Sequence, residues 1–72
     1  MNTVTKQQAE NLATEYGAFR EAYTVDDDLG ISVWGKMLLN SQRALGIELY
    51  TDELLVSIIA MADRKLKQRE AA

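Results

Sequence analysis

The sequence contains no cysteine, no histidine and no proline. Without cysteine the chain forms neither a disulfide framework nor a thiolate nucleophile, and without cysteine or histidine it lacks the usual ligands of a zinc site. A glycine-rich phosphate-binding loop is also missing. A chain this short is also expected to leave no hollow large enough for a substrate. We therefore expect a protein that is not an enzyme and that holds no cofactor and no metal.

Long apolar runs and a strong charge of one sign are absent as well. The longest apolar stretch, residues 54–62, is interrupted by Ser57, whereas a membrane-spanning helix needs about 20 apolar residues. The first residues do not resemble a signal peptide. The net charge of -3 is too small for a DNA mimic and has the wrong sign for a general nucleic-acid binder. We expect a cytoplasmic protein with no membrane partner, and its charge does not favour a nucleic-acid partner.

What the sequence does contain is the composition of a small globular protein. Of its 72 residues, 47% are hydrophobic and 26% are charged. A chain of this length supports one hydrophobic core, so residues 1–72 are predicted to form a single helical domain. Apolar residues recur at helical spacing in three segments, about 6–23, 31–45 and 52–69. The predicted fold is all-α, a compact three-helix bundle.

Three of the predicted helix ends carry recognisable capping residues. Thr5 followed by Gln8 matches a capping box at the start of the first helix. Gly46 is a natural C-terminal cap for the second helix, because glycine adopts the left-handed conformation without steric cost. Thr51, followed by two acidic residues, predicts the start of the third helix.

One face of each predicted helix is apolar and is expected to face the core. The faces comprise Ala9, Leu12, Ala13, Tyr16, Phe19 and Tyr23; Trp34, Met37, Leu38, Ser41 and Leu45; and Leu55, Ile58, Ile59, Ala62 and Leu66. Gly17 and Gly35 lie inside helices, where glycine is about 1 kcal/mol less favourable than alanine. Close packing of a neighbouring helix is one explanation for them.

Two charged clusters suggest binding sites. Asp26, Asp27 and Asp28 offer carboxylates to a cation, but an EF-hand loop counted from Asp26 would need glycine and glutamate where Ile31 and Met37 stand. We interpret the cluster as a solvated loop in which one aspartate caps the next helix.

The second cluster comprises Arg64, Lys65, Lys67 and Arg69, which spread around the last helix without interleaved aromatic residues. We interpret it as a solvated helix end that complements the helix dipole. A helix-turn-helix centred on Gly46 would place Asp52 and Glu53 against phosphates, which disfavours DNA binding. A small DNA-binding regulator is kept as an alternative function.

One stretch resembles a known family. Asp28-Leu29-Gly30-Ile31-Ser32-Val33, followed by Leu45-Gly46-Ile47-Glu48-Leu49, is similar to the second-helix region of acyl carrier proteins. In that family a D-L-G-x-D-S-L motif presents a serine for phosphopantetheine attachment, and a G-I-E-I/L-type turn follows the helix. The resemblance implies Ser32 as the attachment site of an acyl-carrier-like protein, a second alternative function. Ile31 stands where the motif has aspartate.

The preferred hypothesis is a non-enzymatic protein-binding or regulatory module that acts through a helical surface, alone or as a homodimer. Leu39 lies on the polar side of the second helix and Val56 lies outside the core face of the third, so both are expected at the surface. Trp34 would be a natural interface anchor if it turned outward, and Met61 flanks the core face. Leu39, Val56, Trp34 and Met61 are the candidate protein-binding residues.

Overall fold

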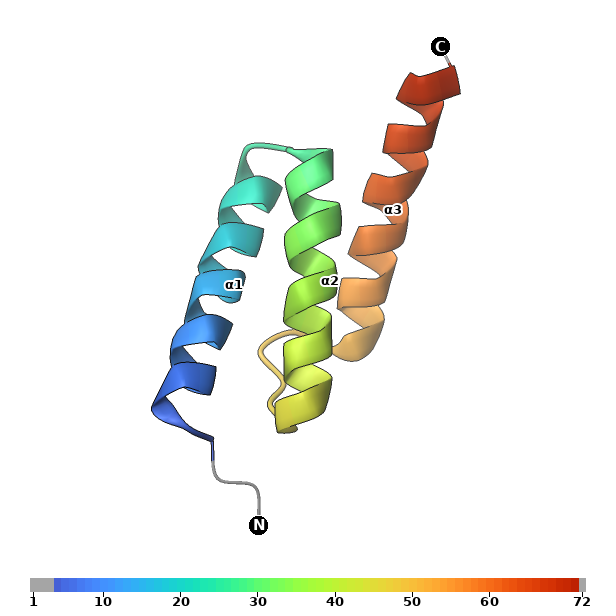
Figure 1. Cartoon of the computed structure of the whole chain (residues 1–72). Coiled ribbons are helices and arrows are strands. Elements are labelled where there is room, and N and C mark those ends of the chain that lie inside the picture. The colour runs from blue at the N-terminus through green and yellow to red at the C-terminus, as the bar shows by residue number, and fades with distance from the viewer. Residues whose placement is uncertain (1–3, 72) are drawn as a thin grey trace.

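The computed structural model describes residues 4–71, which form three helices and, within that range, no strands. The helices are α1 (Lys6–Thr24), α2 (Asp28–Leu45) and α3 (Asp52–Ala71). They run up, down and up, with α2 in the middle and both α1 and α3 packed on it (Figure 1). The predicted fold, an all-α three-helix bundle, is confirmed.

The three predicted caps are also confirmed. The Thr5 side chain accepts a hydrogen bond from the Gln8 backbone N–H at 3.1 Å, and Gln8 Oε1 accepts one from the Thr5 N–H at 2.9 Å. Gly46 ends α2 in the left-handed conformation, with φ of 69°. Thr51 Oγ1 accepts from the Leu54 N–H at 3.1 Å. Local hydrogen-bonding chemistry therefore sets these helix ends.

The start of α2 lies three residues earlier than the sequence pattern predicts. Asp27 is the N-cap, and its carboxylate accepts from the Gly30 N–H at 3.2 Å. Asp26 has a positive φ of 57°, which turns the chain sharply between α1 and α2. The first turn of α2 therefore begins with Asp28, a residue that the sequence analysis had assigned to a loop.

The hydrophobic core draws on all three helices. It consists of Leu12, Phe19 and Ala22 of α1; Ile31, Leu38 and Leu39 of α2; and Leu55, Ile59 and Ala62 of α3. The predicted face of α3 agrees with this core. The predicted face of α1 is rotated from the buried one, because Ala9, Ala13 and Tyr23 are exposed whereas Glu15 and Ala22 are buried.

The predicted core face of α2 is wrong in orientation. Leu39, expected at the surface, is only 8% exposed, whereas Met37, expected in the core, is 42% exposed. The reason is the central position of α2, which packs on α1 along one side and on α3 along another. The buried side of α2 is therefore wider than the single apolar stripe of an amphipathic surface helix. Compared with the predicted core face, it is rotated toward Leu39.

Gly35 of α2 faces side chains of both outer helices. A Cβ atom at this position would lie 2.8 Å from Ile59 Cγ1 of α3 and 3.2 Å from Phe19 Cε1 of α1. The expectation of close helix packing is confirmed here. At Gly17 it is wrong, because a Cβ atom there would have no neighbour within 4 Å.

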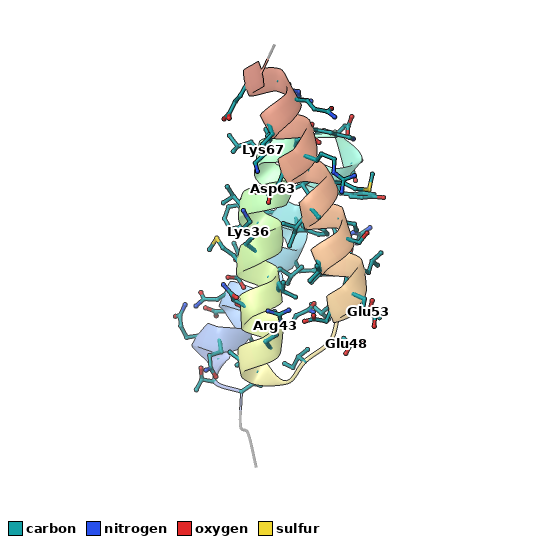
Figure 2. All side chains as sticks on the ribbon, turned by 90° about the vertical axis from the view of Figure 1, so that its right-hand side faces the viewer. Lys36, Arg43, Glu48, Glu53, Asp63 and Lys67 are labelled. Carbon is teal, nitrogen blue, oxygen red and sulfur yellow. The ribbon has the colours of Figure 1, made fainter. Side chains whose placement is uncertain are left out.

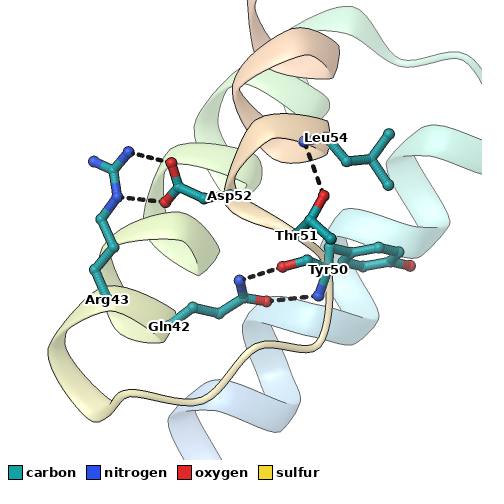
Figure 3. A network of polar contacts seen from close by, with 6 residues as sticks. All are labelled: Gln42, Arg43, Tyr50, Thr51, Asp52 and Leu54. Carbon is teal, nitrogen blue, oxygen red and sulfur yellow. Dashed lines mark hydrogen bonds and ion pairs between the residues drawn. The ribbon is translucent and has the colours of Figure 1, made fainter.

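A buried glutamine holds the connection between α2 and α3 (Figure 3). Gln42 Oε1 accepts from the N–H groups of Leu49 and Tyr50, both at 3.1 Å, and Gln42 Nε2 donates to the Tyr50 carbonyl at 2.9 Å. Beside it, Arg43 donates two hydrogen bonds to the Asp52 carboxylate, at 2.7 and 2.8 Å. This pairing lowers the pKa of Asp52 and raises that of Arg43. The loop is thus fixed to the last turns of α2.

Polar contacts also join α2 to its two neighbours. Ser41 Oγ donates a hydrogen bond to Glu15 Oε1 of α1 at 2.6 Å. Glu15 is buried, so this bond gives its carboxylate a polar partner. On the other side, Lys36 Nζ lies 3.4 Å from Asp63 Oδ2 of α3. Figure 2 shows Lys36, Asp63 and Lys67 along this α2–α3 border. These contacts fix the rotation of each outer helix relative to α2.

Candidate functional site

A groove runs between α1 and α3, because both helices pack on α2 and their backbones are held apart. No Cα atom of α1 lies within 8 Å of one of α3. The gap holds a pocket of about 320 Å³ lined by Tyr23, Asp26, Asp28, Ile31, Ile58, Met61, Ala62 and Lys65. A smaller pocket of about 180 Å³ is lined by Phe19, Tyr23, Tyr50, Leu54 and Ile58. The pockets share Tyr23 and Ile58, and together they form what we call the α1/α3 groove.

The volume of the larger pocket contradicts one expectation. A chain of 72 residues was expected to leave no hollow of a few hundred cubic ångströms, yet the α1/α3 groove contains one of about 320 Å³. The arrangement of the helices explains it. Three helices in a closed triangle would fill this space with side chains, whereas two helices held apart by a third leave it open.

Exposed apolar side chains form the walls of the groove. Leu54 and Met61 of α3 are 46% and 52% exposed, and Ile58 between them is half-buried. Their spacing of four and three residues places them on one side of α3. Tyr23 of α1 faces them from the opposite wall. Large apolar side chains from two helices thus surround one hollow.

Aromatic rings lie at one end of the groove. Tyr50 stacks on Tyr16 with ring centroids 5.5 Å apart, and it meets the edge of Phe19 at the same distance. Burial is the main cause that raises the pKa of the Tyr50 hydroxyl. Because the Gln42 side chain holds the Tyr50 backbone, this end of the groove is built on a fixed loop.

Charged groups lie at the other end. Asp28 is 1% exposed, and its Oδ2 accepts a hydrogen bond from Arg69 of α3. Lys65 Nζ lies 3.8 Å from Asp26 Oδ1 and 4.0 Å from Asp28 Oδ1. The second carboxylate oxygen of Asp28, Oδ1, is buried without a hydrogen-bond partner. This end of the pocket is therefore lined by carboxylates that face two cations of α3, Lys65 and Arg69.

These contacts revise the interpretation of both charged clusters. The aspartates diverge: Asp27 caps α2 as expected, and Asp26 is exposed beside Lys65. Asp28, however, is a buried member of an ion pair and does not belong to a solvated loop. Arg69 is likewise more than a solvated helix end, because its guanidinium pairs with Asp28 across 41 residues of sequence.

The four candidate protein-binding residues do not gather on one surface. Leu39 is in the core, and Trp34 is half-buried and lines a hollow on the α1 side of α2. Val56 is 45% exposed. It lies on the same side of α3 as Asp52 and Asp63, which are four and seven residues away. Both aspartates pair with cations of α2, so Val56 lies on the α2 side of α3. Only Met61 lines the α1/α3 groove.

A second apolar surface was missed by the sequence analysis. Leu29, Val33 and Met37 are 62%, 47% and 42% exposed, and their spacing of four residues places them along one line on α2. We call this line the α2 outer stripe. The spacing of four residues is a signal that the sequence carries, but the same pattern also places Met37 on the predicted core face of the helix.

Ser32, the residue that the acyl carrier resemblance implies as an attachment site, is 5% exposed. Its hydroxyl donates a hydrogen bond to Asp63 of α3, and this bond is the main cause that lowers the pKa of the Asp63 carboxyl, followed by Lys36. Attachment of a phosphopantetheine arm would require this hydroxyl to leave the α2–α3 interface. The position of Ser32 therefore weighs against a carrier function.

Comparisons with known proteins supply no relative. No protein-family model matches the chain, and the searches of curated proteins and of solved structures likewise found no match. Among residues 4–71, none of the helices has the length and apolar character needed to cross a membrane.

Proposed function

We propose that the chain is a non-enzymatic protein-binding module whose α1/α3 groove receives an amphipathic helix of a partner protein. The observation that carries the proposal is the pair of apolar walls, Tyr23 on α1 and Leu54, Ile58 and Met61 on α3. Helix-in-groove recognition uses this geometry, with anchors at spacings of three and four residues. The incoming helix would occupy the fourth position of a four-helix bundle.

The charged groups of the groove support binding over catalysis. Both carboxylates that line the larger pocket are already paired with cations, Asp26 with Lys65 and Asp28 with Arg69. A general base must be able to reach a proton of the substrate, whereas both carboxylates face cations of α3 and the unpartnered Oδ1 of Asp28 is buried. Paired carboxylates of this kind serve structure and recognition better than proton transfer.

Affinity capture with matched variants tests the proposal. Leu54→Asp and Met61→Asp place a charge in the groove, whereas Val56→Asp places the same charge on the other side of α3 at similar exposure. We expect a partner that is captured from the native host by the wild type and by Val56→Asp, and that both groove variants lose. A partner kept by all variants, or the absence of any partner, would contradict the proposal.

The α2 outer stripe is the surface that best suits a homodimer. A two-fold axis across the α2 outer stripe would pack Leu29, Val33 and Met37 against their own copies, as an isologous interface requires. Equilibrium sedimentation tests this mode. A dimer that Val33→Asp dissociates would support it, and a monomer at every concentration would rule it out.

A further inference from the structure

We infer that a second copy of the chain covers the α2 outer stripe, with the two α2 helices side by side and parallel. The acidic border of the stripe in each copy then faces the basic border in the other. The inference rests on the homodimer mode of the proposed function, and it adds the orientation of the two copies. Its basis is the apolar stripe and the opposite charge of its two borders.

The border of the stripe toward α1 is acidic. Gly30 lies between the stripe and α1, because a Cβ atom there would lie 2.9 Å from Ala22 Cβ of α1 and 2.6 Å from Asp27 Oδ2. Glu21 and Asp27 line the hollow on this side of α2 together with Trp34. Both carboxylates are exposed, and neither forms an ion pair within the part of the chain that the structure describes. This border is therefore negatively charged.

The border of the stripe toward α3 is basic. Lys36 and Arg43 lie along this side of α2, where they pair with Asp63 and Asp52 of α3 respectively. Lys67 lies on the same border (Figure 2), and it forms no ion pair with any other described residue. Three cations therefore meet two carboxylates, so this border keeps an excess of positive charge.

The free charges of the two borders lie at the same height along α2. Glu21 comes one residue before the α1 residue that faces Gly30 of α2. Lys67 lies between the two α3 residues that bond to Ser32 and Asp28 of α2. A two-fold axis parallel to α2 preserves height and exchanges the two borders. It therefore places Glu21 of each copy opposite Lys67 of the other.

An antiparallel pair of α2 helices lacks this match. A two-fold axis perpendicular to α2 turns each border toward the same border of the second copy, so that acidic side chains share one edge of the interface and basic side chains the other. Like charges across an interface are unfavourable, whereas complementary charges fix its register. The charges therefore select parallel helices, in which Leu29, Val33 and Met37 each meet their own copy.

The α1/α3 groove stays open in this dimer. Ile31 of α2 lines the groove, and helical spacing places the α2 outer stripe on the opposite side of the helix. Each copy therefore still presents its groove to a partner helix. The dimer carries two such grooves, one on each of its outer faces.

Disulfide crosslinking tests the orientation, because the sequence has no cysteine to interfere. Leu29→Cys and Met37→Cys are oxidised as separate single variants. We expect each to form a covalent dimer with itself, since parallel helices bring equivalent stripe residues within disulfide distance. Met61→Cys, on the groove side at similar exposure, should stay monomeric. A covalent dimer that forms only when Leu29→Cys and Met37→Cys are mixed would show antiparallel helices and overturn the inference.

Charge reversal, followed by equilibrium sedimentation, tests the pairing. Glu21→Lys and Lys67→Glu should each weaken the dimer about three- to tenfold, because each change turns two attractive contacts per dimer into repulsive ones. Combining both changes in one chain should restore the wild-type affinity. Arg64→Glu is the matched control and should have no such effect, because helical spacing places Arg64 on the side of α3 away from α2.

Two outcomes of the sedimentation experiment would overturn the inference: no recovery in the combined variant, or a monomer at every concentration. The monomer would also remove the homodimer mode, whereas antiparallel crosslinks would leave that mode intact. The proposed binding of a partner helix is tested separately, by the capture experiment with Leu54→Asp and Met61→Asp.

Discussion

Replacing each of two helical glycines by alanine should change the free energy of unfolding differently if the described packing is correct. Gly17 and Gly35 both lie inside helices, so alanine brings the same gain in helix propensity at each, about 0.5 to 1 kcal/mol. At Gly17 the new methyl group meets nothing within 4 Å, so the gain is kept. For a chain of this size, that stabilisation raises the Tm by about 3 to 8 °C.

At Gly35 the new methyl group enters the core. It would lie 2.8 Å from Ile59 Cγ1 and 3.2 Å from Phe19 Cε1, distances at which the neighbours must move. Overpacking of this kind costs about 1 to 3 kcal/mol. The cost offsets or exceeds the propensity gain, so we expect Gly35→Ala to change the free energy of unfolding by about 0 to -2 kcal/mol. The two variants should therefore differ by about 1 to 3 kcal/mol in stability.

Urea denaturation followed by far-UV circular dichroism measures both variants, and a double-mutant cycle isolates the cause. In an Ile59→Ala background the main clash is removed, so Gly35→Ala should become less destabilising by about 1 to 3 kcal/mol. A Gly35→Ala protein that is stabilised as much as Gly17→Ala would refute the close approach of α2 and α3. So would an identical effect of Gly35→Ala in both backgrounds.

Three further predictions concern α2 and its contacts. In urea denaturation, Leu39→Ala should destabilise the protein by about 2 to 4 kcal/mol, because Leu39 is buried. Met37→Ala should cost less than about 1 kcal/mol, because Met37 is exposed. A larger cost for Met37→Ala than for Leu39→Ala would show that Met37, and not Leu39, lies in the core. Gln42→Ala removes three hydrogen bonds to the loop and should cost about 1 to 3 kcal/mol, with faster amide exchange at residues 49 and 50. Because the folded pKa of Asp63 lies below its unfolded value, its stabilisation is full above about pH 4 and is lost as the pH falls through the folded pKa. Asp63→Asn should therefore reduce the acid dependence of the unfolding free energy, and an unchanged pH profile would contradict the contact with Ser32.

The helix ends could be predicted from sequence because they depend on neighbouring residues. Thr5 and Gln8, Gly46 and Thr51 each act within one helical turn, and the structure places caps at all three ends. The core face of α3 could also be predicted, because α3 packs on a single neighbour and has one apolar stripe. The start of α2 was ambiguous because any of three adjacent aspartates is a suitable cap, and only the sharp turn at Asp26 selects Asp27.

The candidate site could not be predicted in the same way, because it depends on which helices touch. The central position of α2 buries Leu39 and exposes Met37, and it holds α1 and α3 apart so that a groove opens between them. The burial of Asp28 depends on Arg69, 41 residues away, whose position no local pattern specifies. Helical periodicity determined three amphipathic helices, and local capping residues determined three of their ends. Tertiary packing decided which face of each helix is buried against its neighbours. The reason is that residues distant in sequence interact only once the chain has folded.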